Sequence, residues 1–202
     1  MRLANIAAAV GLAAAAIVSS AVAFPPQAPL LPATSSTHQV ELTLGVMSRC
    51  PDAFLVEALI DQTLADERVK GKVALELVYI GMLDNDAPGG ITCKHGELEC
   101  DGNVQQLCVQ AYLNQSDWWP FVVCQDGQPA RIGTTGLAEE CAAQVGFEWS
   151  GEIRRCAEEG EGQRRLRESV RRTQEMGIEK SATILLGKEH KVRLPAGCLC
   201  LA

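Results

Sequence analysis

Residues 40–56 decide the fold of this chain and read VELTLGVMSRCPDAFLV. Apolar residues alternate with others from Val40 to Val46, which is the period-two pattern of a β-strand. Beyond Pro51 the apolar residues take the spacing of a helix, whose inner face would carry Val56, Ile60 and Leu64. Proline is favoured at the first helical position, because the N–H that it lacks would have no partner there. The sequence therefore predicts a strand that leads into a helix with Cys50 at its N-cap.

Two further segments complete a sheet. Residues 72–80 are largely apolar on both faces, as expected of a central strand that helices cover. Strand, helix and strand in this order form one βαβ unit. Residues 183–186 and 191–194 flank the segment 187–190 and predict a β-hairpin. Together these elements predict an α/β fold with a mixed sheet.

The segment 84–160 carries six of the nine cysteines and shows little periodicity. We expect it to be an insertion with short helices that disulfides hold together. One helix is predicted from Ser150 to about Ala157. A longer one is predicted from Gln163 to Met176, with a buried stripe of Leu166, Val170 and Thr173.

The first 23 residues predict a secretory signal peptide. Arg2 is followed by an uncharged apolar stretch and by the small residues Ala21 and Ala23, which suit cleavage after Ala23. A membrane anchor is the alternative, but an apolar core of roughly 10–15 residues is short against the ~20 that a span needs. Residues 24–38 are rich in Pro and Ser and are expected to be a disordered leader. Residues 39–202 would then form one domain.

The charge of the chain limits its partners. Removing Arg2 with the signal peptide changes the net charge from −7 to −8. Such a surface argues against nucleic acid and anionic membranes as partners of the mature protein. It suits the secretory pathway, with the extracellular space or a lysosome or vacuole as destination.

All nine cysteines lie in the predicted mature part. An oxidising compartment converts most cysteines to disulfides, and an odd number leaves at least one thiol over. Cys50 is the candidate, because a helix start favours a thiolate and would expose it. A structural half-cystine or a buried inert thiol is the alternative for Cys50. The other eight cysteines could form four disulfides, whose pairing stays open.

Residues 93–108, CKHGELECDGNVQQLC, are the most specific stretch of the chain. They resemble the signature of the gamma-interferon-inducible lysosomal thiol reductase family, C-Q-H-G-x2-E-C-x2-N-x4-C, and only Lys94 departs from it. The matching residues are Cys93, His95, Gly96, Glu99, Cys100, Asn103 and Cys108. The resemblance extends over roughly residues 38–190.

The resemblance implies a thioredoxin-like fold and the reduction of protein or peptide disulfides, often at acid pH. Family members use a C-x-x-C motif at the start of the first helix. Here that stretch reads Cys50-Pro51-Asp52-Ala53, so the nucleophile is kept and the resolving cysteine is alanine. The resemblance therefore predicts a monothiol oxidoreductase that needs an external thiol reductant, unless another cysteine of the chain resolves the adduct.

A second departure lies at residues 180–183, where enzymes of the thioredoxin fold present a cis-proline. This chain has no proline there. Because a cis bond before another residue costs about 3–4 kcal/mol, we expect a trans peptide.

Two other interpretations remain. A non-catalytic, disulfide-stabilised secreted binding protein could keep this scaffold without the activity. A zinc site of His95 with Cys93, Cys100 and Cys108 would need reduced cysteines, which the compartment disfavours. We therefore expect no metal and no cofactor, with His95 as a hydrogen-bonding loop residue. Trp118 and Trp119 are expected to pack in the core of the insertion.

The sequon Asn114-Gln115-Ser116 predicts a glycan on Asn114 in a secreted chain. Protein from a glycosylating host should lose mass on treatment with a glycosidase, and Asn114→Gln should remove that difference. An unchanged mass of the untreated and treated wild type would contradict this prediction.

Overall fold

The computed structural model describes residues 39–187 and 190–193. The predicted signal peptide, the leader, and Cys198 and Cys200 lie outside the described residues. The domain bounds drawn from the sequence therefore stay predictions.

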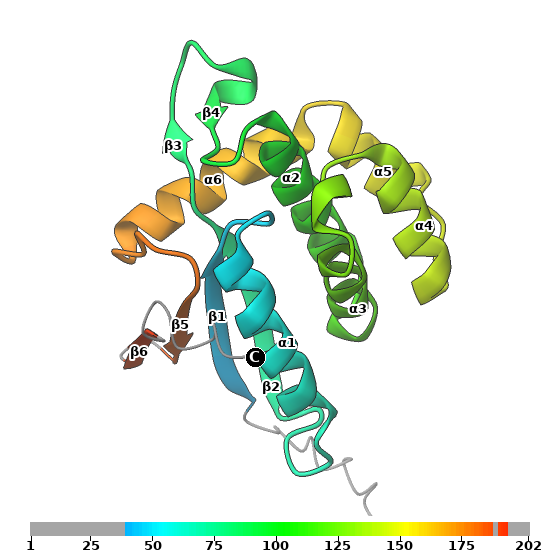
Figure 1. The fold of residues 1–202 in the computed structure, drawn as a ribbon, viewed down its shortest axis with the longest axis vertical. Helices are drawn as coiled ribbons and strands as arrows, with labels where there is room; N and C mark the ends of the chain where they lie inside the picture. Colours follow the sequence, from blue (N-terminus) through cyan, green and yellow to red (C-terminus); the bar gives the residue numbers. More distant parts are fainter. Residues whose placement is uncertain (1–38, 188–189, 194–202) are drawn as a thin grey trace, which may run out of the picture. The chain divides into compact units, whose positions relative to one another are not determined.

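The chain forms the predicted βαβ unit. It consists of β1 (Val40–Val46), α1 (Pro51–Ala65) and β2 (Val73–Tyr79). The two strands are parallel, with Val40 opposite Val73 and Val46 opposite Tyr79. The carboxyl-terminal half of each strand is buried, as expected when helices cover a parallel sheet. Figure 1 shows α1 lying along β1 and β2.

The predicted hairpin completes this sheet. It is formed by β5 (Thr183–Leu186) and β6 (His190–Arg193), which pair antiparallel, and β5 also pairs antiparallel with β1. The strand order is β2-β1-β5-β6. A separate small pair of strands was not predicted: β3 (Met82–Leu83) with β4 (Ile91–Thr92), joined through the 3-10 turn η1 (Pro88–Gly90). Two-residue strands are too short to leave a periodic pattern.

Helices build the rest of the described chain. They are α2 (Glu97–Tyr112), α3 (Gln115–Asp126), the 3-10 turn η2 (Pro129–Arg131), α4 (Thr135–Val145), α5 (Gly151–Glu158) and α6 (Glu161–Glu175). The last two confirm the predicted helices, and Leu166, Val170 and Thr173 of α6 are buried as expected. The expectation of short helices only is wrong for α2. Its buried face carries polar residues such as Gln105 and Gln106, and these hide the apolar period.

Three disulfides hold the helical region. Cys93–Cys100 links the residue after β4 to α2, Cys108–Cys156 links α2 to α5, and Cys124–Cys141 links α3 to α4. Each such bridge stabilises a fold by about 2–4 kcal/mol. Because all three cysteines of the zinc interpretation are oxidised, they cannot supply thiolate ligands.

The tryptophans of α3 pack in the core, as the sequence predicted. Trp118 and Trp119 are both buried and meet edge to face, with ring centroids 5.9 Å apart. Phe121 stacks on Trp149 at 5.7 Å and joins α3 to the segment before α5.

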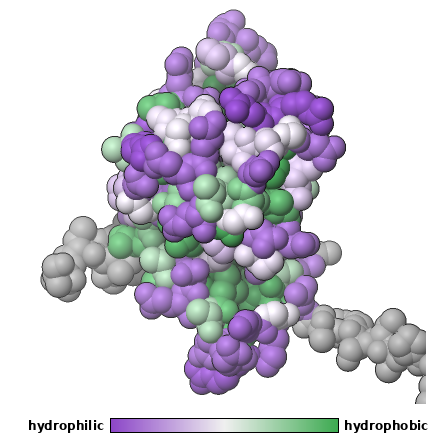
Figure 2. Space-filling model, turned by 90° about the vertical axis from the view of Figure 1, so that its right-hand side faces the viewer, coloured by the Kyte–Doolittle hydropathy of each residue, from purple (hydrophilic) through white to green (hydrophobic). Residues whose placement is uncertain are grey.

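The described surface is mixed in polarity. Figure 2 shows one face on which hydrophobic residues gather across the middle, between hydrophilic residues above and below. The exposed apolar side chains of the described residues include Leu55 and Leu59, one turn apart on α1. Within this described part, no helix is long and apolar enough to cross a membrane.

Candidate thiol site

Cys50 caps the start of α1. Its backbone is extended, with φ −86° and ψ 125°, and its carbonyl accepts a hydrogen bond from the Ala53 N–H at 2.9 Å. Pro51 occupies the first turn, as predicted. The partial positive charge of a helix N-terminus favours a thiolate at this position. Cys50 is also the free cysteine of the described residues, since the other six are paired.

The Cys50 side chain is less accessible than the sequence led us to expect. Only 6% of the residue is exposed, and it belongs to the hydrophobic core. The reason is the direction of the helix: the inner face of α1 starts at Cys50 and continues through Ala53 and Glu57. Placing a residue at a helix start fixes its electrostatics, but the face on which it lies fixes its exposure.

Position 53 is one helical turn beyond the thiol. Ala53 is fully buried and lies on the same face as Cys50. The helix therefore has the geometry of a two-cysteine motif with a methyl group in place of the second sulfur. Among the described residues no other free thiol is present.

Helix α2 holds the loop that leads to Cys50. The Ser48 N–H donates to Asn103 Oδ1 at 3.0 Å, and Ser48 Oγ donates to the Glu99 carbonyl at 3.1 Å. Gly102 lies beneath this contact, since a Cβ there would come within 2.7 Å of Ser48 Oγ and 2.5 Å of Ile132. Only glycine lets the helix approach the loop so closely.

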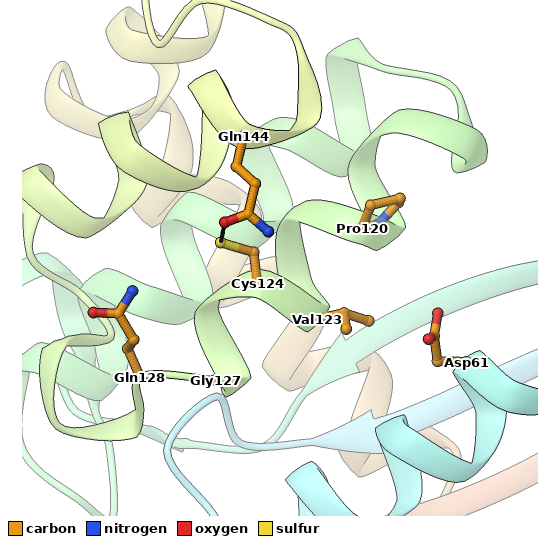
Figure 3. Close-up of a pocket in the computed structure, with 7 residues that line it drawn as sticks. All are labelled: Asp61, Pro120, Val123, Cys124, Gly127, Gln128 and Gln144. Carbon is orange, nitrogen blue, oxygen red and sulfur yellow. Dashed lines mark hydrogen bonds between the residues drawn. The ribbon is translucent and has the colours of Figure 1, made fainter.

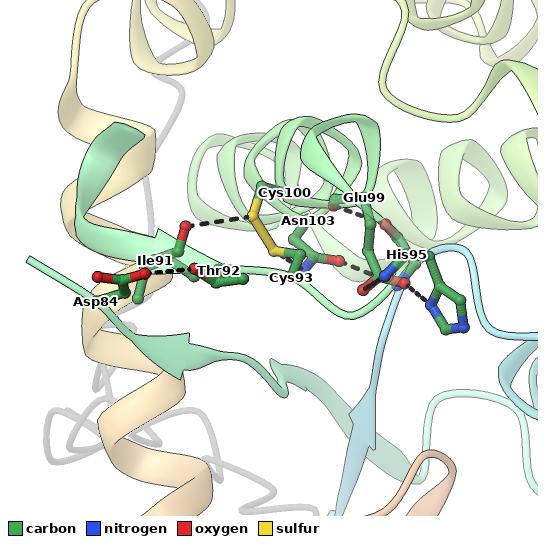
Figure 4. The surroundings of a disulfide bond; sticks show 9 residues. Asp84, Ile91, Thr92, Cys93, His95, Glu99, Cys100 and Asn103 are labelled. Carbon is green, nitrogen blue, oxygen red and sulfur yellow. Dashed lines mark hydrogen bonds and ion pairs between the residues drawn. A yellow bond between two sulfur atoms is a disulfide. The ribbon is translucent and has the colours of Figure 1, made fainter. Parts of the chain in front are cut away.

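The signature residues form most of this support (Figure 4). Asn103 Nδ2 donates to Cys93 Sγ at 3.7 Å, and Cys93 is bridged to Cys100. Glu99 is fully buried: one carboxylate oxygen accepts the His95 N–H at 3.2 Å and the other contacts His95 Nδ1. His95 thus makes hydrogen bonds within its loop.

The remaining two signature residues have other places. Gly96 has a φ of 87°, which suits glycine, and it precedes α2. Cys108 lies further along α2, in the bridge to Cys156. Gly96 therefore serves the turn into α2 and Cys108 the packing of α2 on α5, so the signature supports more than the loop before Cys50.

The peptide bond between Ser181 and Ala182 is cis, and the expectation of a trans bond is wrong. The sequence argument weighed only the local cost of the bond. In the folded chain the segment is held on both sides, because Ser181 Oγ accepts the Met47 N–H at 3.3 Å and Thr183 Oγ1 donates to the Lys180 carbonyl at 2.7 Å. The segment therefore meets the end of β1, three residues before Cys50.

Two buried carboxyl groups near Cys50 were missed by the sequence analysis. Glu57 of α1 is 1% exposed, and burial, together with Asp126, raises its pKa well above the usual value. Burial also raises the pKa of Asp126, at the end of α3, to about 7. A signal was available for Glu57, since a charged residue interrupts the apolar inner face of the predicted helix. Nothing in the sequence pairs it with Asp126.

A cavity of about 470 Å³ opens further along α1 (Figure 3). It is lined by Asp61, Pro120, Val123, Cys124, Gly127, Gln128 and Gln144. Asp61 lies on α1 about 16 Å beyond Cys50 along the helix axis, at ~1.5 Å per residue. Cys50 itself does not line this cavity.

Comparison with known proteins decides the family. The model of the gamma interferon inducible lysosomal thiol reductase family matches residues 41–145, which include Cys50 and the whole signature. The chain belongs to this family. No curated protein is similar enough in sequence to count as a relative of the chain.

Solved structures show the same fold at low sequence identity. BdbD from Bacillus subtilis has a TM-score of 0.58 at 15% identity, over 77% of this chain and 79% of that one. MdbA from Corynebacterium diphtheriae, a thiol-disulfide oxidoreductase, has a TM-score of 0.58 at 13% identity, over 80% and 81%. Reduced DsbA from Mycobacterium tuberculosis has a TM-score of 0.55 at 14% identity, over 81% and 79%. The thioredoxin-like fold with a helical insertion is thereby confirmed.

Family membership supports thiol-disulfide oxidoreductase activity and points to protein disulfides as substrates. Together with the three disulfides, it indicates a secretory or lysosomal location.

We predict that Asn103→Ala loosens the loop before Cys50. The buried Ser48 N–H would lose its acceptor, at a cost of about 1–3 kcal/mol, and the loop would open more often. Alkylation of Cys50 by a small reagent should therefore become several-fold faster.

The matched control is Gln110→Ala. Gln110 is also on α2 and also binds a backbone N–H, that of Leu77 at 2.8 Å, but it lies away from the loop. Gln110→Ala should lower the urea concentration at the midpoint of unfolding without changing the rate at which Cys50 is alkylated. Equal rates for both variants would contradict the role of Asn103.

Proposed function

We propose that this protein is a monothiol oxidoreductase that reduces disulfide-containing proteins or peptides through Cys50, with an external thiol as reductant. The observation that carries the proposal is the state of the cysteines. Six of the seven described cysteines are paired in disulfides, and the unpaired one lies at a helix N-terminus.

The reaction would proceed through two adducts of Cys50. The Cys50 thiolate attacks one sulfur of the substrate disulfide, which forms a mixed disulfide and releases the other sulfur as a thiolate. An external thiolate then attacks Cys50 Sγ and releases the second substrate sulfur. A second external thiol frees Cys50 and leaves with the first as a disulfide. The balance is one substrate disulfide reduced and two external thiols oxidised.

Because position 53 is alanine, the adduct must be resolved by an external thiol or by another cysteine of the chain. In a C-x-x-C enzyme the second cysteine attacks the mixed disulfide within the molecule, with effective concentrations that can exceed about 10⁵ M for well-oriented groups. The methyl group of Ala53 cannot do this. We therefore expect slow turnover that depends on the concentration of the external thiol.

The sequence and the disulfides support a setting for this reaction. The protein would act in the secretory pathway, outside the cell or in a lysosome or vacuole, after removal of residues 1–23. Its mature form would have no nucleic-acid or membrane partner. No cofactor enters the reaction.

A non-catalytic binding protein on the same scaffold is the second candidate. The low exposure of Cys50 favours it, as does the exposed apolar pair Leu55 and Leu59 on α1. Exposed apolar patches are typical of surfaces that bind other proteins. The two candidates differ in one property, the reactivity of Cys50.

We predict that Ala53→Cys raises disulfide-reductase activity and that Cys50→Ser abolishes it. The new thiol would lie one turn from Cys50 and resolve the mixed disulfide internally. Activity on a disulfide-containing protein substrate, measured from acid to neutral pH with a fixed external thiol, checks both variants.

The matched control is Gln62→Cys, which adds a thiol to the exposed side of α1 and should leave the rate unchanged. Removing residues 198–202 tests whether Cys198 or Cys200 resolves the adduct. If either does, the truncation should lower the wild-type rate but not that of Ala53→Cys. Full activity of Cys50→Ser would exclude Cys50 as the nucleophile. If no variant reduces a disulfide at any pH, the binding protein replaces the enzyme.

A further inference from the structure

Glu57, buried on α1, and Asp126, whose Oδ1 is buried at the end of α3, form a pair of acids. Burial, together with Asp126, raises the pKa of Glu57, and burial raises that of Asp126, so both carboxyl groups hold a proton to higher pH than exposed acids do. Glu57 Oε2 and Asp126 Oδ1 are buried and find no hydrogen-bond partner among the described residues. Among the described residues, no basic side chain contributes to the pKa shift of either acid. A salt bridge therefore does not account for the pair.

Glu57 lies behind Cys50 on the same face of α1. Cys50, Ala53 and Glu57 follow one another at intervals of one turn and are 6%, 0% and 1% exposed. Long side chains in a helix lean toward its N-terminus, so the Glu57 carboxyl leans toward Ala53 and the thiol. The small side chain of Ala53 puts only a methyl group between them. Cys50 and Glu57 interact electrostatically, since the charge of Cys50 contributes to the raised pKa of Glu57.

The charge of the pair changes in the range where such an enzyme would work. Burial is the largest cause of the raised pKa of both acids, and it brings that of Asp126 to about 7. The pair is therefore largely protonated in an acid compartment and gains negative charge toward neutral pH. In the low-dielectric interior this charge is poorly screened.

The other titratable groups near Cys50 and the pair are exposed or make hydrogen bonds and contacts of their own. Tyr79 of β2 faces the pair, but burial raises its pKa, and its hydroxyl donates to Gln106 at 2.7 Å, so it stays neutral. Beside the thiol, Asp52 is exposed, and the Arg49 guanidinium donates to the Ala130 carbonyl at 3.5 Å. On the side of α2, His95 and Glu99 contact each other.

We propose that the Glu57–Asp126 pair sets the pH range over which Cys50 reacts. Below neutral pH the pair is uncharged or singly charged, and the thiolate forms against little repulsion. As the pH rises the pair ionises, and its negative charge opposes ionisation of the thiol. The two titrations are linked, so the reactivity of Cys50 rises less steeply with pH than that of an isolated thiol. Reduction by this protein would therefore be less dependent on pH and better retained in acid.

The biological consequence rests on the proposed function, but the linkage itself does not. Alkylation measures the thiolate of Cys50 whether or not the protein turns over a disulfide. The two proposals can therefore fail separately.

The experiment is the pH profile of Cys50 alkylation by iodoacetamide in the full chain, from pH 4 to 8. The labelled peptide is identified by mass, so that only Cys50 is counted. The variants are Glu57→Gln, Asp126→Asn and the double variant, which keep the size and polarity of the side chains. Asp61→Asn is the control, because it lies one turn beyond Glu57 at the open cavity and still accepts from Trp119 Nε1.

The wild type should show a flattened profile near neutral pH. The double variant should rise about tenfold per pH unit, as an isolated thiol does below its pKa, and should exceed the wild type several-fold at pH 8 while matching it at pH 4. Asp61→Asn should follow the wild type.

Superimposed profiles of the wild type and the double variant would overturn the proposal, as would a slower double variant at pH 8. Urea unfolding checks that each variant is folded. If the Glu57 variants do not fold, Asp126→Asn alone must show the steeper profile, and its failure to do so also overturns the proposal. A shifted profile in a protein without reductase activity would sink the proposed function and leave this linkage standing.

Discussion

The hydrogen bond from the Ser48 N–H to Asn103 Oδ1 joins the sheet to the helical region at the place where the chemistry is expected. On one side lies β1, which ends two residues before Ser48, and on the other lies α2, which the Cys93–Cys100 bridge anchors. Because Gly102 allows a close approach, the loop has no room to shift without moving α2. The position of Cys50 therefore depends on a contact that most of the signature residues help to build.

This arrangement divides the cysteines by role. The paired cysteines stabilise helices with buried polar residues, such as the chain of side-chain amides Gln106, Gln125 and Gln105, linked at 2.9 Å each. Such amides satisfy one another but add little to the hydrophobic driving force, so covalent links are useful here. Cys50 takes no part in these links and stays a free thiol.

The sequence predicted those features whose cause is local. The strand 40–46, the helix from Pro51 and the stripe of α6 follow from hydrophobic period and from proline at a helix start. The family signature added the fold, because seven fixed positions are far more specific than periodicity. The length of α2 could not be predicted, since glutamines replace apolar residues on its buried face. The exposure of Cys50, the cis peptide at Ser181 and the pairing of Glu57 with Asp126 depend on segments far apart in the chain, which no local pattern records.

The central claim, that Cys50 exchanges with substrate disulfides while the paired cysteines hold the fold, is tested most directly by trapping. The secreted protein is incubated with a disulfide-containing peptide, quenched with acid and mapped by mass spectrometry without reduction. We expect a mixed disulfide between the peptide and Cys50, with the bridges Cys93–Cys100, Cys108–Cys156 and Cys124–Cys141 intact. A stable bridge at Cys50, or an adduct on a signature cysteine with Cys50 unmodified, would contradict the account.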